Sequence, residues 1–301
     1  MPLIPNDFLR SAKRTLNGFA AVLFIQKVTG YILIFAGAAA VTVFCPDQTI
    51  ADSFLTSIYT DTALRVLWMI PVMIYARLNL TQREPLPTRK LSVPLPLVFA
   101  AMCLVAFFAR IPGAFLFGTD SNIEIGLSLS GTQLWVFAVS TAIIAPLTEE
   151  YMFRSVLLRA MRPFGRNGYL LVSSLLFASL HAPGSTFFAF CVALFLGYVA
   201  YETGGMRYTA GMHMLFNFVS VVLMIAQLSG NETAETALAL GYLAFIFIAG
   251  GVGIVLCVRG LHKNGRLTVK WLPVRCSFTI PVLLFLAYRA VSYALSVLVS
   301  A

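Results

Sequence analysis

The sequence predicts an all-α protein, a polytopic transmembrane helical bundle of about eight or nine spans. Its 301 residues are 59% hydrophobic and only 11% charged, whereas soluble domains carry roughly 25% charged residues. Several apolar stretches reach the roughly 20 residues that an α-helix needs to cross a bilayer. These stretches are continuous and do not alternate with polar residues, which argues against a β-barrel.

Nine apolar segments are expected to span the membrane. In chain order they are 28–45, 62–78, 92–109, 132–160, 168–182, 186–202, 207–228, 236–258 and 277–300. The first follows a stretch with Arg10, Lys13, Arg14 and Lys27, in which no small-residue cleavage site of a signal peptide stands out. Residues 1–27 are therefore expected to form a cytosolic juxtamembrane amphipathic helix on the membrane surface.

Basic residues collect in alternate loops. The basic segments are the N-terminus, 77–90, 159–167 and 259–275, whereas the loops between them are acidic or neutral. Because basic loops stay on the cytosolic side of a membrane, this alternation predicts a cytosolic N-terminus and an outer C-terminus, and it favours nine spans over eight. The net charge of +9 is thus explained by topology and by contact with membrane lipids, and a nucleic-acid partner is not expected.

Two of the expected spans have irregular sequences. Pro146, in the fourth span, removes a backbone hydrogen bond and is expected to kink the helix one turn before a pair of glutamates. The fifth span ends at the sequence His181-Ala-Pro-Gly-Ser, which is a stop signal for a helix.

A small set of polar residues lies at membrane depth, where an ionised side chain costs at least about 2.5 kcal/mol on insertion scales. They are Glu149, Glu150, Arg154, His181, His213 and Asn217. Taken singly, the acid–arginine pair could be a structural ion pair, and each histidine or the asparagine could be a hydrogen bond between helices. Their joint occurrence on three successive helices exceeds what packing requires and favours a functional site.

Helical spacing separates the two glutamates. Glu150 and Arg154 are four residues apart on one helix face, which suits an ion pair. Glu149 is rotated by about 100° from Glu150 and has no partner on its own helix. Its expected partner is His181 on the next helix, and a glutamate–histidine pair could activate a water molecule near neutral pH.

His213 and Asn217 have the same four-residue spacing and complete an ordered set of motifs. Glu149-Glu150-x-x-x-Arg154, Phe177-x-x-x-His181 and His213-x-x-x-Asn217 resemble the three signature motifs of the CPBP intramembrane proteases, also called the CAAX prenyl protease or Abi family. The resemblance covers residues from about 130 to about 225. The flanking spans carry no motif that can be attributed to this family.

The resemblance implies an intramembrane endopeptidase whose site opens toward the cytosol. Its substrate would be a membrane-associated protein or peptide, prenylated in some members of the family. By position, Glu149 and His181 would activate the attacking water, while Glu150 and Arg154 would hold the site together.

The resemblance also implies residues that stabilise the transition state, and it leaves open whether a metal ion takes part. His213 and Asn217 would stabilise the oxyanion, and Phe177 would pack against the site. His181, His213 and Glu149 could supply a zinc site of the His₂Glu kind. Yet no HExxH sequence is present, and the family is also described with a metal-free glutamate–histidine pair, to which we give slight preference.

The resemblance also suggests how the chain is organised. We expect a juxtamembrane helix at 1–27, N-terminal transmembrane helices at 28–130, a CPBP-like catalytic core at 131–228 and C-terminal transmembrane helices at 229–301, in a bacterial inner membrane. Two other functions stay open: a proton-coupled transporter that uses the same groups as a relay, and a non-catalytic immunity or scaffold member of the family. No internal repeat is evident, which counts against a transporter, and the intact motifs count against loss of catalysis.

Overall fold

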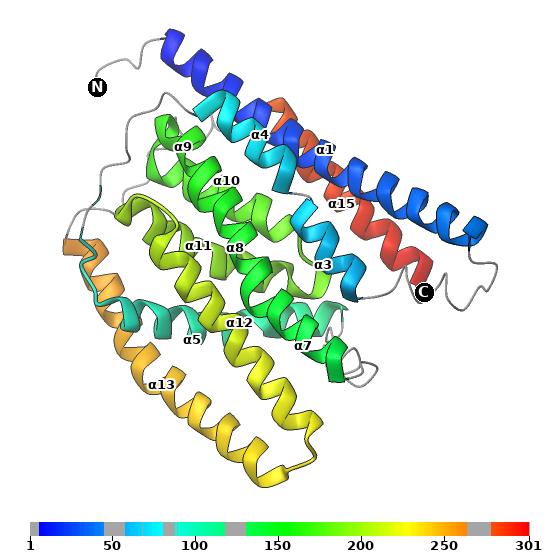
Figure 1. The fold of residues 1–301 in the computed structure, drawn as a ribbon. Helices are drawn as coiled ribbons and strands as arrows, with labels where there is room; N and C mark the ends of the chain where they lie inside the picture. The colour runs from blue at the N-terminus through cyan, green and yellow to red at the C-terminus, as the bar shows by residue number, and fades with distance from the viewer. Residues whose placement is uncertain are drawn as a thin grey trace.

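The computed structural model describes residues 6–44, 58–67, 69–80, 88, 90–117, 131–263 and 278–300, and within these ranges every regular element is a helix (Figure 1). The α-helices are α1 (Asn6–Phe44), α3 (Ile58–Leu67), α4 (Met69–Leu80), α5 (Leu95–Phe117), α7 (Gly131–Val139), α8 (Ala145–Glu150), α9 (Leu158–Met161), α10 (Gly165–Ser179), α11 (Thr186–Thr203), α12 (Arg207–Leu228), α13 (Glu232–Lys263) and α15 (Ile280–Ser300). Two π-helices, η1 (Ser140–Ile144) and η2 (Tyr151–Leu157), and two 3₁₀ turns, η3 (Arg162–Phe164) and η4 (Pro183–Ser185), join them.

The predicted fold class, a helical membrane bundle, is confirmed. By length and composition, 6 helical segments in the described residues are long and apolar enough to cross a membrane: Lys13–Gly37, Leu95–Phe115, Gly131–Met161, Pro183–Thr203, Arg207–Leu228 and Glu232–Gly260. The predicted spans 62–78 and 168–182 fall on shorter helices, namely α3 with α4, and α10. The predicted span 277–300 falls on α15, in which the apolar stretch Ile280–Leu295 is shorter than the six candidate segments. Whether these shorter helices also cross the bilayer stays a prediction.

The N-terminal region forms one continuous helix. α1 runs from Asn6 to Phe44 without a break near residue 27, and its apolar window begins at Lys13. The surface location of residues 1–27 stays a prediction. Some of the loop charges that predict the orientation, among them Asp120, Glu124 and Lys270, lie outside the described residues.

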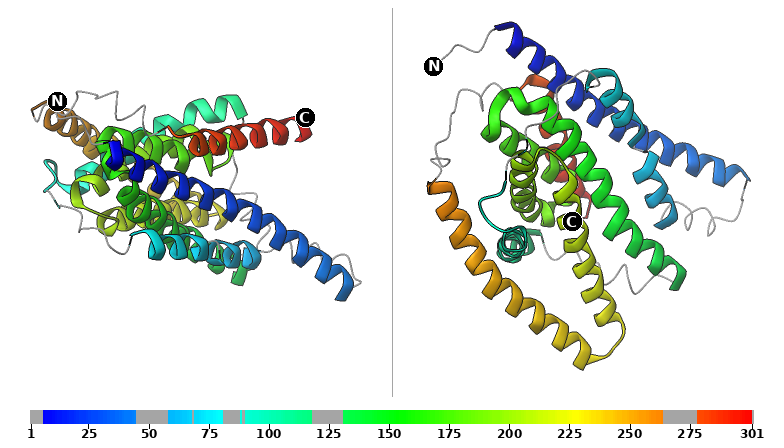
Figure 2. Two further views of the ribbon diagram at one scale, coloured as in Figure 1. Left: turned by 90° about the horizontal axis from the view of Figure 1, so that it is seen from above. Right: turned by 60° about the vertical axis from the view of Figure 1, so that its left-hand side comes forward.

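α11 lies between two apolar cores. The first core joins α1, η2, α10, α11 and α15 through side chains such as Phe19, Phe153 and Phe285. The second joins α5, α11, α12 and α13 through Met102 and Phe216, among others. Accordingly, α1 and α15 lie side by side along one flank of the molecule, and α13 packs against α5 on the other (Figures 1 and 2).

α5 and α13 approach closely because glycine is present at the contact. A Cβ atom on Gly250 would lie 2.7 Å from the Ala100 carbonyl oxygen, and one on Gly253 would overlap the Leu97 carbonyl oxygen. Small residues of this kind let membrane helices pack backbone to backbone. The packing therefore depends on these two glycines.

The irregularity expected at Pro146 takes the form of π-helix. Pro146 is the second residue of α8, which directly follows the π-helix η1, and a second π-helix, η2, starts at Tyr151. A proline has no N–H to donate to the preceding turn, and π-bulges occur often at functional sites. The two glutamates thus lie on a short α-helical segment between two π-helices.

Candidate functional site

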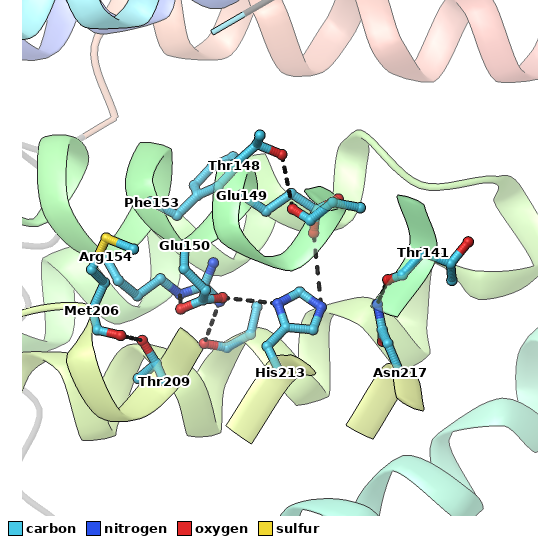
Figure 3. A network of polar contacts seen from close by, with 12 residues as sticks. Thr141, Thr148, Glu149, Glu150, Phe153, Arg154, Met206, Thr209, His213 and Asn217 are labelled. Carbon is cyan, nitrogen blue, oxygen red and sulfur yellow. Dashed lines mark hydrogen bonds and ion pairs between the residues drawn. The ribbon is translucent and has the colours of Figure 1, made fainter. Parts of the chain in front are cut away.

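Three helical segments bring the six predicted polar residues into one region. Glu149 and Glu150 end α8, and Arg154 follows in η2. α12 packs against α8 and η1 and carries His213 and Asn217 (Figure 3). His181 lies two residues beyond the end of α10. The sequence placed these residues on three successive helices, and the packing of the helices brings them together.

Glu150 is the centre of the buried network. Its side chain is 0% exposed; Oε2 lies 3.4 Å from Arg154 Nε, and Oε1 lies 3.0 Å from His213 Nδ1. The predicted ion pair between Glu150 and Arg154 is therefore present, and the histidine is an additional partner from α12. An isolated carboxylate would be very costly in this position, so the two partners make its burial tolerable.

Arg154 is as deeply buried as its partner. It is 0% exposed, its Nη2 donates to the Ala193 carbonyl oxygen at 3.5 Å, and its guanidinium carbon lies 4.6 Å from the centre of the Phe177 ring. The ring face thus contributes a cation–π contact. Phe177 packs against the site, as the motif resemblance implied.

Glu149 differs from Glu150 in exposure and in partner. Its side chain is 21% exposed, and Oε2 lies 3.9 Å from His213 Nε2. The sequence paired Glu149 with His181; among the described residues no direct ion pair joins these two, and their joint action on a water molecule stays a prediction. Glu149 lies against the histidine of α12 because α12 packs directly on α8.

His181 is oriented by the end of the helix that precedes it, α10. Its Nδ1 lies 3.0 Å from the Phe177 carbonyl oxygen, and its ring centre lies 4.7 Å from that of Phe177. A carbonyl can only accept, so Nδ1 carries the proton and Nε2 is the nitrogen with a lone pair. Glu149 is among the charged groups that act on His181 through space.

Asn217 connects α12 to the first π-helix. Its Nδ2 donates to the Thr141 carbonyl oxygen at 2.8 Å. This bond spans 76 residues of sequence and holds η1 against α12. One amide hydrogen of Asn217 is thereby used, and the second is the one that an oxyanion role would require.

α15 contributes a contact that the sequence analysis missed. Arg289 Nε donates to the Ser179 carbonyl oxygen at 2.5 Å, and the Tyr293 hydroxyl donates to the same oxygen at 2.6 Å. Ser179 is the last residue of α10, two residues before His181. The signal was available, because Arg289 is a buried charge in an apolar helix, which is the criterion that identified the glutamates.

The arrangement does not fit the zinc site that the sequence allowed. In the part of the chain that the structure describes, no three His, Cys, Asp or Glu side chains are close enough together to hold a metal ion. His213 Nδ1 is directed at Glu150, and Glu149 lies against His213 without His181 as a third donor.

Comparison with known proteins bears out the motif resemblance. Residues 131–219 match the family described as type II CAAX prenyl endopeptidase Rce1-like, a match consistent with the CPBP family and one that supports a protease in general. The chain is also 25% identical over 248 residues to an uncharacterized protein of Mycoplasma capricolum subsp. capricolum, covering 74% of this chain and 70% of that protein. No solved structure matches the chain.

Proposed function

We propose that this protein is an intramembrane endopeptidase in which glutamate and histidine activate a water molecule to hydrolyse a peptide bond of a membrane-associated substrate. The observation that carries the proposal is the position of His213 between two carboxylates of unequal exposure, Glu150 at 0% and Glu149 at 21%. The similarity of residues 131–219 to CAAX prenyl endopeptidases supports the reaction class.

The two carboxylates have different roles in this proposal. Glu150, paired with Arg154, accepts the Nδ1 proton of His213 in a hydrogen bond and so fixes the tautomer and orientation of the ring, as an orienting carboxylate does in other proteases. The partly exposed Glu149 is the general base. It can be reached by water, whereas Glu150 cannot.

The reaction uses one water molecule and no other reactant. Glu149 removes a proton as the water oxygen bonds to the peptide carbonyl carbon, and the resulting oxyanion is stabilised by donors such as the second amide hydrogen of Asn217. The C–N bond then breaks, and the proton passes from Glu149 to the leaving amine. His181, with a lone pair on Nε2, is a second acceptor that orients the water.

We further propose that the protein lies in a bacterial inner membrane with its N-terminus in the cytosol. The distribution of basic loops supports this orientation. The substrate would be a protein or peptide held at the same membrane, and prenylation of that substrate is left to experiment.

The test is cleavage of peptides by the purified protein in detergent. The substrates are a farnesylated peptide ending in a CAAX sequence and the same peptide without the lipid, each with and without a chelator. We expect Glu149→Gln to lower kcat/KM by about 10²- to 10⁴-fold, the range for loss of a general acid–base group. His213→Ala should also lower it, because the ring that lies between the two carboxylates is lost. Glu232→Gln, an exposed carboxylate at the start of α13, is the matched control and should retain activity.

The outcomes separate the alternatives. Full activity of the folded Glu149→Gln variant would refute the assigned general base. A folded wild-type protein that cleaves neither peptide, but moves protons in liposomes, would favour a transporter. Chelator-sensitive cleavage that zinc restores would show that a metal takes part.

A further inference from the structure

A pocket outside the network of Glu149 and Glu150 opens between α4 and η2. It has a volume of 620 Å³, within the usual range of roughly 300–1,000 Å³ for ligand pockets. Its walls are mainly apolar side chains of α4, with Tyr151 and Ser155 of η2 opposite. Its two charged lining residues are both arginines, Arg77 and Arg159.

The charges lie at one end of this pocket. α4 packs against η2, and the path from α3 to α4 runs in the same direction as that from α7 to α9 (Figure 1). Arg77 lies seven residues beyond Ile70, about 10 Å along the helix, and Arg159 lies eight residues beyond Tyr151, about 12 Å along it. The two guanidinium groups therefore share an end, and the opposite end is apolar.

The apolar wall is open to the surroundings. Ile70 is 50% exposed, and Met73 and Ile74 are each 55% exposed. In a membrane protein, such side chains face lipid. Arg77 and Arg159 belong to the two basic segments that predict the cytosolic surface, so the charged end lies at the predicted interface and the apolar end reaches toward the bilayer interior.

We propose that this pocket binds an anionic phospholipid of the cytosolic leaflet. The lipid phosphate lies between Arg77 and Arg159, and an acyl chain packs along Ile70, Met73 and Ile74. Two arginines at one end attract a headgroup with a net negative charge more strongly than a zwitterionic headgroup with none, and a free phosphate ion would leave the apolar wall unused. The observed order of apolar and cationic groups matches an amphiphile with an anionic head.

The bound lipid would be a neighbour of the proteolytic site without being its substrate. Tyr151 lines the pocket and directly follows Glu150 in the chain. A ligand that binds only the folded protein stabilises it, and here the stabilised segment is η2. The proposal does not depend on the proteolytic function.

Native mass spectrometry of the full chain tests this proposal without any peptide substrate. Phosphatidylglycerol, phosphatidylcholine with the same acyl chains, and inorganic phosphate are titrated separately into the detergent-solubilised protein. We expect a one-to-one complex with phosphatidylglycerol, weaker binding of phosphatidylcholine, and no competition by inorganic phosphate at equal concentration.

Charge variants locate the binding site. One arginine near the headgroup region is worth about fivefold in affinity, so Arg77→Gln should weaken phosphatidylglycerol binding by about that factor and Arg77→Gln/Arg159→Gln by about thirtyfold. The control Arg10→Gln/Arg14→Gln removes the same charge from exposed positions of α1 and should change binding less than about twofold. Because Arg77 is exposed, the single variant remains informative if the double variant fails to fold.

Three results would overturn the proposal. Equal losses in the two double variants would indicate attraction by general surface charge. Competition by inorganic phosphate at equal concentration would indicate an ion site that does not use the apolar wall. An unchanged affinity in Ile74→Trp, which places a bulky ring against that wall, would show that no acyl chain lies there.

Discussion

Replacing Arg154 by methionine should destabilise the fold far more than the same change in an exposed ion pair. Arg154 and Glu150 are four residues apart, and both side chains are 0% exposed. Arg65 and Asp61 have the same spacing, but their side chains are 38% and 46% exposed. The exposed pair has the shorter N–O distance, 2.6 Å against 3.4 Å. Distance alone would therefore make loss of the exposed arginine the more costly change, whereas burial makes loss of the buried arginine more costly.

Burial should decide the outcome. Removing one partner of a buried ion pair costs about 3–5 kcal/mol, because the remaining charge stays desolvated. His213 still contacts Glu150 at 3.0 Å, which places Arg154→Met toward the lower end of that range. An exposed pair contributes roughly 0.2–1 kcal/mol, and Arg65→Met should cost no more than that.

The assay is reversible unfolding of the purified protein by SDS in mixed micelles, followed by circular dichroism. The double variant Arg154→Met/Glu150→Gln should unfold with a free energy at least about 1 kcal/mol closer to wild type than Arg154→Met alone, since its buried charge is gone. If Arg154→Met costs no more than Arg65→Met, the buried network is not desolvated and the reasoning fails.

Two further predictions concern contacts outside the motif residues. Arg289→Met should lower the free energy of unfolding by about 1.5–3 kcal/mol, because a charged hydrogen bond to the end of α10 is lost. Tyr293→Phe should lower it by about 1 kcal/mol. Negligible effects of both variants in the same SDS assay would contradict the contact. Gly253→Ala should cost about 1–3 kcal/mol because its Cβ would overlap a carbonyl of α5. Gly251→Ala on the same helix, where nothing lies within 4 Å of the added atom, should be neutral or stabilising, and similar losses in both glycine variants would refute close packing of α5 and α13.

The sequence was sufficient for features that depend on composition and on spacing along one helix. Continuous apolar stretches predict a helical membrane bundle, and the long helices confirm it. The ion pair of Glu150 with Arg154 followed from a separation of four residues, since helical geometry alone brings such side chains together. The stop at His181-Ala-Pro-Gly-Ser also followed from local chemistry, and α10 ends at Ser179.

Contacts between helices required the folded structure. Spacing showed that Glu149 has no partner on its own helix, but it could not show that His213 lies 3.9 Å from its carboxylate. The same holds for Arg289, whose bond to the end of α10 spans 110 residues of sequence. Helical periodicity sets which residues share one face, whereas the packing of α12 on α8 and of α15 on α10 decides which faces meet. The two glutamates are alike in sequence, and only the arrangement of the neighbouring helices makes one fully buried and leaves the other partly exposed.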